Sequence, residues 1–529
     1  MPWTDMIGLE DLAAKGKVVV RRNGLQVLLI KFGRGVFACA NRCPHEGYPL
    51  SEGVLSQGCL LTCNWHNWKF DLESGETLAG GDRLRRFPVR VEAGRVMVDM
   101  TPEDPAVRRD RALSGLRRAL EDEDQDRLVR ETARLMRLGV DAAEPVTEAI
   151  AWMAERLEFG TQHAIGAAPD WLKLYDRSST NADRKLAAIG EILGHIADDA
   201  HGGRIFPFAA GQAPWDAAAF LNAVERENEA AAVALARGGL AEGMQARDFL
   251  PTLVRAALAH YGDFGHSLIY SVKTVALAER LGPKSAEPLL LMLTRSLVCM
   301  TREDLLPEFR DYSARLAEWG RKGKPAPALE VASIVGVSTR RAMTVVTAWS
   351  GDHTPQAIFA VLVEAAAWTL LHADERVFLR SDGKLADNVN WLDFTHALTF
   401  AEAGRAAVRS APELWPAVLL QIACFIGRNG AYVDRDLDVA PFAVADPADF
   451  ISQATERLFD HGLDRFILSA HRPKTLMAGV VLTKAVPAAA PTIHAALNRF
   501  LSARIKRRHV LRTARQMRAF VAQEEPVHP

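Results

Sequence analysis

The sequence predicts two parts of different class, a small antiparallel β domain over residues 1–101 and a large all-α domain over residues 102–529. In the first part, short runs that alternate apolar and polar residues are separated by tight turns. After about Arg111 the composition shifts to Ala, Leu, Arg and Glu, and apolar residues recur at spacings of three and four. A chain of 529 residues is long enough for about three domains of ordinary size.

The β domain begins with three candidate strands in chain order, VVV at 18–20, QVLLIKF at 26–32 and VFACA at 36–40. It closes with FPVRVEAGRVMVDM at 87–100. In this last stretch apolar valines alternate with polar residues on both sides of an Ala-Gly turn, which predicts a hairpin. The alternating positions are Val89, Val91, Val96 and Val98.

The second part reads as a long series of helices. LVRETARLMRLGV at 128–140 and RKLAAIGEILGHIA at 184–197 are typical of its apolar periodicity. Prolines and glycines gather at 321–328, which suggests that two duplicated helical halves divide near 321–330. The alternative is an ordinary surface loop.

Net charge and hydropathy exclude several classes of function. Lys plus Arg number 64 and Asp plus Glu number 65, so no overall field attracts nucleic acid or an anionic membrane surface. The N-terminus lacks the apolar core of a signal peptide. The longest apolar run, which begins at Ala357, contains Glu364 and is too short to span a membrane. We therefore expect a cytoplasmic protein with no nucleic-acid or membrane partner.

Two cysteine–histidine pairs between the strands form the most informative motif. Cys43-x-His45 and Cys63-x-x-His66 provide two thiolates and two imidazoles in two tight turns. Four such ligands could hold zinc. The flanking strand signals, the glycines between the pairs and the aromatic residues that follow favour an iron–sulfur cluster instead.

The order C-x-H, seventeen residues, C-x-x-H and then NWKFDLESGE resembles the Rieske 2Fe-2S family, in the branch of the ring-hydroxylating oxygenases and Rieske ferredoxins. The resemblance implies that Cys43 and Cys63 bind one iron of the cluster and that His45 and His66 bind the other. In the ring-hydroxylating oxygenases a β-rich catalytic domain with a mononuclear iron follows. Helices follow here, so no iron ligands of that domain are carried over.

Tyr48 and Trp65 stand where the respiratory and photosynthetic Rieske proteins have two further cysteines. The loops then have no cross-link and fewer polar donors face the cluster sulfurs. We expect a reduction potential of roughly −150 mV, at the low end of the Rieske range.

Two segments of the helical part share the pattern Asp-Phe-x-His. Asp263 with His266, and Asp393 with His396, are each three residues apart, which puts both side chains on one helix face or in one turn. Two such pairs facing each other would offer two imidazoles and two carboxylates to a second iron, a geometry similar to that of di-iron bundles. His260 is a further candidate ligand or proton donor. The alternative is that these are ordinary core histidines, because fifteen histidines will place some near acids by chance.

The segment GDFGHSLIY at 262–270 and the Ala-rich helices after it are similar to the questin-oxidase-like proteins, a family of helical, histidine-containing oxygenases. No residue role is carried over from that similarity.

These observations predict a Rieske-type oxidoreductase, most specifically an oxygenase. The cluster would pass single electrons to the histidine/carboxylate site for O₂-dependent oxidation of a small organic molecule. The chain has no phosphate-binding glycine loop, so we expect an external reductase or ferredoxin as the electron donor. The family resemblance also implies a homo-oligomer. One alternative is an electron-transfer or redox-sensing module fused to a helical interaction domain without chemistry of its own. Another is a helical domain that binds substrate without a metal.

Overall fold

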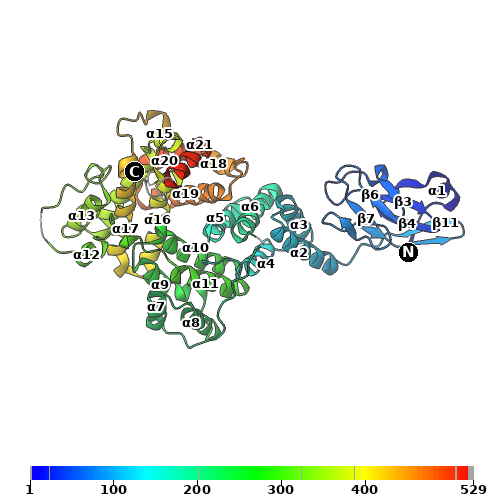
Figure 1. Ribbon diagram of the computed structural model, residues 1–529, viewed down its shortest axis with the longest axis horizontal. Coiled ribbons are helices and arrows are strands. Elements are labelled where there is room, and N and C mark those ends of the chain that lie inside the picture. The colour runs from blue at the N-terminus through cyan, green and yellow to red at the C-terminus, as the bar shows by residue number, and fades with distance from the viewer. Residues whose placement is uncertain are drawn as a thin grey trace, which may run out of the picture. The chain divides into compact units, whose positions relative to one another are not determined.

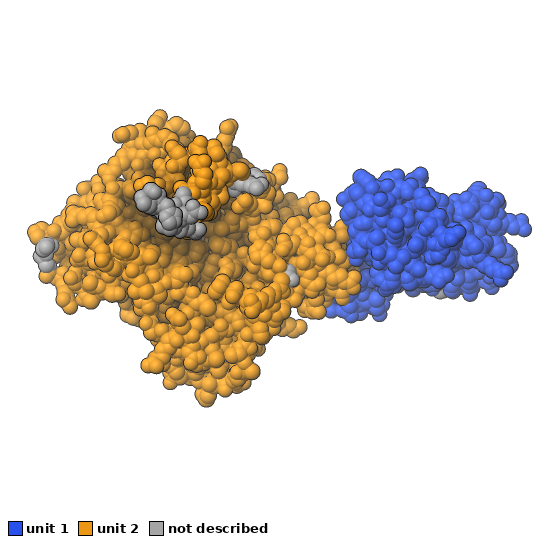
Figure 2. Space-filling model, in the orientation of Figure 1, with its two compact units in different colours: residues 1–111 blue, residues 112–529 orange. Residues whose placement is uncertain are grey.

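The computed structural model describes residues 3–22, 24–201, 203–322, 325–385, 388–506 and 509–521. The chain forms two compact units, Met1–Arg111 and Ala112–Pro529, coloured separately in Figure 2. The first is built of antiparallel strands and the second of helices (Figure 1), so the predicted fold class is confirmed. Residues 323 and 324, within the connection expected at 321–330, lie outside the described residues.

The first unit contains three antiparallel sheets, in the strand orders β1-β11-β10, β2-β3-β4-β9 and β5-β6-β7-β8. The short third sheet carries the second of the two cysteine–histidine loops. The elements are β1 (Trp3–Gly8), α1 (Leu9–Lys15), β2 (Lys17–Arg22), β3 (Leu25–Phe32), β4 (Gly35–Ala40), β5 (Val54–Ser56), β6 (Leu60–Thr62), β7 (Lys69–Asp71), β8 (Thr77–Ala79), β9 (Arg86–Phe87), β10 (Val89–Glu92) and β11 (Arg95–Asp99).

The expected closing hairpin is β10 and β11. Val89 pairs with Val98 and Val91 pairs with Val96, which is the register that the alternating valines indicate. The two turn residues, Ala93-Gly94, both have positive φ, 48° and 72°. Two-residue turns of this kind match the right-handed twist of the strands.

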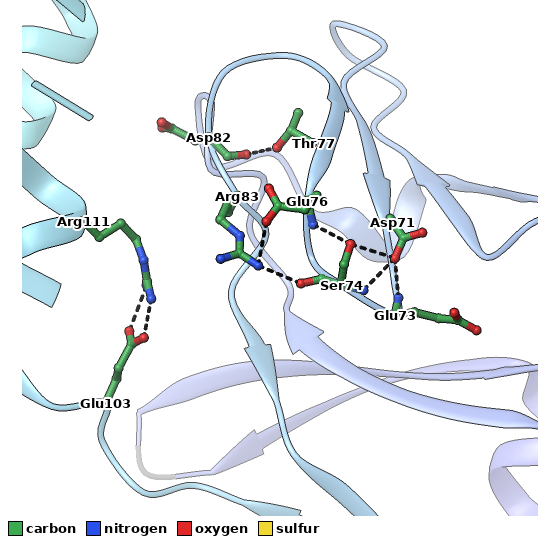
Figure 3. Close-up of polar contacts among 9 residues, drawn as sticks. All are labelled: Asp71, Glu73, Ser74, Glu76, Thr77, Asp82, Arg83, Glu103 and Arg111. Carbon is green, nitrogen blue, oxygen red and sulfur yellow. Dashed lines mark hydrogen bonds and ion pairs between the residues drawn. The ribbon is translucent and has the colours of Figure 1, made fainter. Parts of the chain in front are cut away.

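A polar network shapes the turn between β7 and β8, directly after the second cysteine–histidine loop (Figure 3). The Asp71 carboxylate accepts hydrogen bonds from the backbone N–H of Glu73 at 2.8 Å and of Ser74 at 2.6 Å. Arg83 donates to the Ser74 carbonyl at 2.9 Å and pairs with Glu76 at 2.9 Å. These contacts fix the hairpin whose first strand, β7, begins just beyond the loop.

The second unit is helical over its described residues. Its α-helices are α2 (Pro105–Glu121, which begins in the first unit), α3 (Gln125–Arg137), α4 (Ala143–Met153), α5 (His163–Arg177), α6 (Ala182–Ala200), α7 (Ala217–Glu225), α8 (Glu229–Ala241), α9 (Ala246–Leu258), α10 (His266–Leu281), α11 (Pro283–Val298), α12 (Tyr312–Ala317), α13 (Thr339–Trp349), α14 (Pro355–Leu371), α15 (Glu375–Leu379), α16 (Trp391–Ser410), α17 (Trp415–Asn429), α18 (Pro447–Leu458), α19 (Phe466–Ala485), α20 (Ala490–Ser502) and α21 (Val510–Val521). Among the described helices, none combines the length and apolar character that crossing a membrane requires.

Four helices that are distant in sequence form a closed ring in the core of this unit. Helix α10 packs against α5 and α16, and α19 packs against the same two helices. In Figure 1, α5 lies in the cyan-green part of the ribbon, α10 in the green, α16 in the yellow and α19 in the orange. A site in the middle of this ring can therefore draw side chains from four separate segments.

A buried ion-pair network ties three of these helices together. Lys273 on α10 donates to the Asp170 carboxylate on α5 at 2.9 Å and lies 3.5 Å from Glu402 on α16. Asp170 is fully buried, and burial by itself would raise its pKa. The two lysines beside it, Lys273 and Lys173, nevertheless hold the pKa of Asp170 below its ordinary value.

Replacing Lys273 by Met will destabilise the helical unit by about 3–5 kcal/mol, because it leaves a buried carboxylate without its buried partner. Chemical denaturation followed by helical circular dichroism measures this loss. Lys173→Met is the matched control, since Lys173 pairs with the same Asp170 but its side chain is 48% exposed. We expect that control to cost no more than about 1 kcal/mol. Equal losses in the two variants would contradict the assignment of the buried pair.

Candidate functional site

The two cysteine–histidine loops of the first unit have matching backbone hydrogen bonds. The amide of each cysteine donates to the carbonyl five residues later, at 2.9 Å for Cys43 and 2.8 Å for Cys63. Each loop closes on a residue with left-handed backbone, Gly47 (φ 79°) in the first and Asn67 (φ 58°) in the second. Glycine and asparagine tolerate this conformation better than other residues. The loops are therefore two copies of one local structure.

The loops bring two thiols inside the protein and two imidazoles to its surface. Cys43 and Cys63 are 4% and 1% exposed. Burial, with a contribution from the neighbouring Cys63, raises the pKa of Cys43 to about 11. Such thiols ionise readily only beside a bound cation. The rings of His45 and His66 meet edge to face at 4.7 Å, and His66 is exposed. Two inner sulfurs and two outer nitrogens fit a 2Fe-2S cluster with different ligands on its two irons.

Aromatic side chains hold the two imidazoles in place. Trp68 stacks on His45 with ring centroids 4.5 Å apart, and Trp65 stacks on His66 at 5.2 Å. Tyr48 contacts Trp65 edge to face at 5.4 Å. Tyr48 and Trp65, at the positions where the respiratory and photosynthetic Rieske proteins have cysteines, thus form an aromatic pair. The low reduction potential stays a prediction.

A second candidate site lies where α5, α10, α16 and α19 meet. Each helix contributes one histidine, and the four rings form a closed cycle of contacts with centroid distances of 5.0, 4.8, 5.1 and 5.0 Å. The Nε2 atoms of His266 and His396 are 3.0 Å apart. The ligand nitrogens of His163, His266 and His471 all lie within 4.8 Å of one another.

Backbone carbonyls fix the tautomers of three of these rings. The Nδ1 atom lies 2.8 Å from the Asp263 carbonyl in His266, 2.6 Å from the Leu392 carbonyl in His396 and 2.6 Å from the Ile467 carbonyl in His471. A carbonyl only accepts, so Nδ1 carries the proton and Nε2 presents its lone pair. This arrangement is the one that metal-binding histidines commonly have.

The lone pairs then face one another, which is unfavourable unless a cation lies between them. His266 and His396 direct two of them at each other across 3.0 Å. Among the described residues, the Nε2 atoms of His163 and His471 are buried without a hydrogen-bond partner. An unpaired polar atom in the interior needs a compensating ligand. The four nitrogens therefore fit a metal ion, and imidazole donors suit iron, copper, zinc and nickel.

All four imidazoles are held in the neutral, metal-binding form. Burial is the largest cause that lowers each pKa, and the positive charge of Lys474 lowers it further. The pKa of His266 falls to about 3. Lys474 itself is buried one turn after His471, and burial lowers its pKa to about 8.

The other residues expected at this site have different partners. Asp263 accepts a hydrogen bond from the Ser267 hydroxyl at 3.1 Å, and burial raises its pKa to about 6. Asp393 accepts a hydrogen bond at 2.7 Å from the backbone N–H of Asn390, the N-cap residue of α16. His260 lies 2.8 Å from Glu225 and 3.3 Å from Asp304. The structure thus brings His266 and His396 together at 3.0 Å. Among the described residues, the group whose ligand atoms all lie within 4.8 Å consists of His163, His266 and His471, so it contains neither aspartate, and His396 reaches it through its contact with His266.

His163 and His471 were not among the site residues predicted from the sequence. His163 opens α5, which has three alanines in its first turns, and His471 lies on a face of α19 that also carries the buried Lys474 and Thr475. Their one shared signal is a histidine beside small buried residues, Ala164 and Ala470, which let neighbouring helices approach closely. That signal is weak because such a histidine is usually an ordinary core residue.

The first unit, with its antiparallel sheets and paired ligand loops, defines an iron–sulfur electron-transfer domain. A family model described as the Rieske [2Fe-2S] domain matches residues 2–87. The chain belongs to the Rieske [2Fe-2S] proteins through this unit, which binds a 2Fe-2S cluster.

Three relatives are similar to this chain. The ferredoxin subunit of methanesulfonate monooxygenase from Methylosulfonomonas methylovora is 30% identical over 104 residues, which are 20% of this chain and 85% of that protein. The ferredoxin component of the alkene monooxygenase system of Xanthobacter autotrophicus is 32% identical over 101 residues, 19% of this chain and 83% of that protein. The 4beta-methylsterol monooxygenase of Methylococcus capsulatus is 34% identical over 100 residues, 17% of this chain and 26% of that protein.

Proposed function

We propose that this chain is an oxidoreductase in which the Rieske cluster passes single electrons to a metal held by His163, His266, His396 and His471, for O₂-dependent oxidation of a small organic substrate. The redox character is supported by the cluster and by the relatives, whose names place them in oxygenase systems. The expected histidine/carboxylate site becomes, in this proposal, a site of four imidazoles.

The observation that carries the proposal is the close approach of His266 and His396 with both Nδ1 atoms bonded to carbonyls. A pair of ordinary core histidines would share a proton along such a contact, with one ring donating and the other accepting. Here the carbonyls require both protons on the outer nitrogens. The contact is therefore best explained by a cation. We propose iron, which, like copper, binds imidazole and changes oxidation state one electron at a time.

The chain's own residues have separate tasks in this scheme. Cys43 and Cys63 would hold the buried side of the cluster, and His45 and His66 its surface side. A 2Fe-2S cluster supplies one-electron transfer. The exposed His66 edge, with Trp65 (56% exposed) stacked on it, is a surface on which an external reductase or ferredoxin can dock. Burial keeps the four inner histidines neutral, so protons do not compete with the proposed metal for their ring nitrogens.

Metal analysis of the purified full chain tests the proposal. We expect three irons per chain, two in the cluster and one at the imidazoles. The double variant His266→Ala/His396→Ala should keep the two cluster irons and the EPR signal of the reduced cluster, and lose the third. When this double variant is supplied with electrons, its oxygen consumption should be lower than that of the unaltered protein.

Two irons per chain in the unaltered protein, with no other metal, would overturn the second site. That result would favour the alternative of an electron-transfer or redox-sensing module fused to a non-catalytic helical domain. Zinc at the four histidines would also overturn the O₂ chemistry, because zinc has no redox change to offer.

A further inference from the structure

The turn that leads into α10 has an unusual backbone. Asp263, Phe264 and Gly265 have consecutive positive φ values of 51°, 50° and 76°. Two of the three are not glycine, and residues other than glycine enter this region only where surrounding contacts hold them there. At Gly265 a side chain would meet the ring of Phe425 at 2.7 Å. The 263–265 turn therefore depends on contacts with the residues around it.

Two charged residues clamp the turn. One oxygen of Glu303 accepts a hydrogen bond from the Phe264 amide at 3.1 Å, and the other accepts from Arg428 at 2.7 Å. The Arg428 guanidinium in turn lies over the Phe264 ring, 4.3 Å from its centroid. Phe264 is thus held by its backbone from one side and by its ring from the other. Cation–π contacts and charged hydrogen bonds of this kind are strong where they are shielded from water.

The clamped turn touches two of the four imidazoles. The Asp263 carbonyl accepts the Nδ1 proton of His266 at 2.8 Å, so the path of the turn sets the direction of that ring. The Phe264 ring packs edge to face on His396 at 4.4 Å. The second Asp-Phe-x-His copy has no such turn, since Asp393 and Phe394 are already helical and Phe394 packs against Phe378.

We propose that Glu303 and Arg428 are positioning residues that act through the 263–265 turn on His266 and His396. They hold the two Nε2 atoms at their close separation and so set the ligand geometry of the metal. This inference rests on the proposed metal site, which it deepens. Neither residue contacts the imidazoles directly in any hydrogen bond or ring contact found among the described residues.

Copper(II) is a suitable probe, because imidazoles bind it well and its EPR spectrum reports ligand geometry. The full chain with its cluster oxidised is first dialysed against a chelator to empty the four-histidine site, and is then titrated with one equivalent of copper. We expect Glu303→Gln to bind copper at the same stoichiometry, with about 10-fold weaker affinity and changed g and hyperfine values, as is usual when a partner of a metal ligand is lost.

The matched control is Glu229→Gln. Glu229 pairs with Arg295 at 2.8 Å, and Arg295 lies over Phe208 at 4.1 Å, so the same kind of clamp is removed elsewhere in the unit. We expect this variant to give the spectrum and affinity of the unaltered protein. If Glu303→Gln lowers helical circular dichroism, Phe264→Leu decides instead, and the same spectral change is expected from it.

The possible failures are distinguishable. Glu303→Gln, or Phe264→Leu where that variant decides, with unaltered affinity and spectrum would overturn the positioning role and leave the metal site standing. Copper binding that is the same in the unaltered protein and in His266→Ala would overturn the metal site itself, and this inference with it.

Discussion

Cys63→Ser will abolish the iron–sulfur centre of the first unit. We expect the visible absorption and the EPR signal of the reduced protein to disappear, and the iron content to fall by two atoms per chain. Cys63 is 1% exposed and lies beside Cys43, so a serine there presents an un-ionised hydroxyl in an apolar pocket. Soft thiolates are the ligands that iron–sulfur clusters select, and a hydroxyl does not replace them.

Cys59→Ser is the control for this loss. Cys59 lies in the same sheet region but is only half-buried, and its thiol faces Glu73 at 3.8 Å. We expect that variant to keep both irons and the reduced EPR signal. A cluster signal that survives in Cys63→Ser would show that the ligand set has been assigned wrongly.

We expect His471→Ala to remove the proposed second metal while the cluster stays intact. Removing a residue that hydrogen-bonds to a metal ligand already weakens the affinity for the metal by roughly 10–100-fold. Removing the ligand itself should weaken it at least as much. His471 is the informative choice, because its Nε2 is buried without a hydrogen-bond partner among the described residues. Metal analysis after dialysis, with the reduced-cluster EPR signal as the internal reference, measures the effect.

The comparison variant is His260→Ala. His260 is already paired with Glu225 and Asp304, and it lines a surface cavity of about 360 Å³ with Arg302 and Arg255. Its removal should leave both metal sites filled. If His260→Ala lost the second metal and His471→Ala kept it, the metal would lie at that cavity and not among the four helices.

The first unit could be predicted from the sequence because its signals are local. The paired ligands lie within four residues of one another in Cys43–His45 and Cys63–His66, and each pair fits one tight turn. The closing hairpin likewise follows from alternating valines and an Ala-Gly turn, and the observed register agrees with it. The convergence of the two loops, which lie seventeen residues apart, is not a local signal and was implied by the family resemblance.

The repeated Asp-Phe-x-His pattern was a weaker guide, because identical residues adopt different local structures in its two copies. Asp263 has a φ of 51° before α10 begins, whereas Asp393 is the third residue of α16. The sequence held a signal for the second case. Asn390 three residues before Asp393 forms a capping box, in which the carboxylate bonds to the backbone and is not available to a metal.

His163 and His471 could not be found in the same way. They are separated from each other and from His266 and His396 by between 75 and 308 positions in the sequence, as the residue numbers show. Only the packing of α5 and α19 against α10 and α16 brings them together. A site assembled by helix packing leaves no fixed spacing in the chain, and a buried histidine has the same local sequence whether or not it binds a metal.

The four-imidazole ring also has an electrostatic consequence. The four imidazoles are uncharged, so they do not neutralise any of the positive charge of a metal ion bound between them. The ammonium group of Lys474 makes the electrostatic potential at the site more positive still. Since a low-dielectric interior penalises every additional unneutralised charge, such a pocket favours the divalent over the trivalent ion. Iron at the proposed site would then stay ferrous until an anion enters to balance its charge.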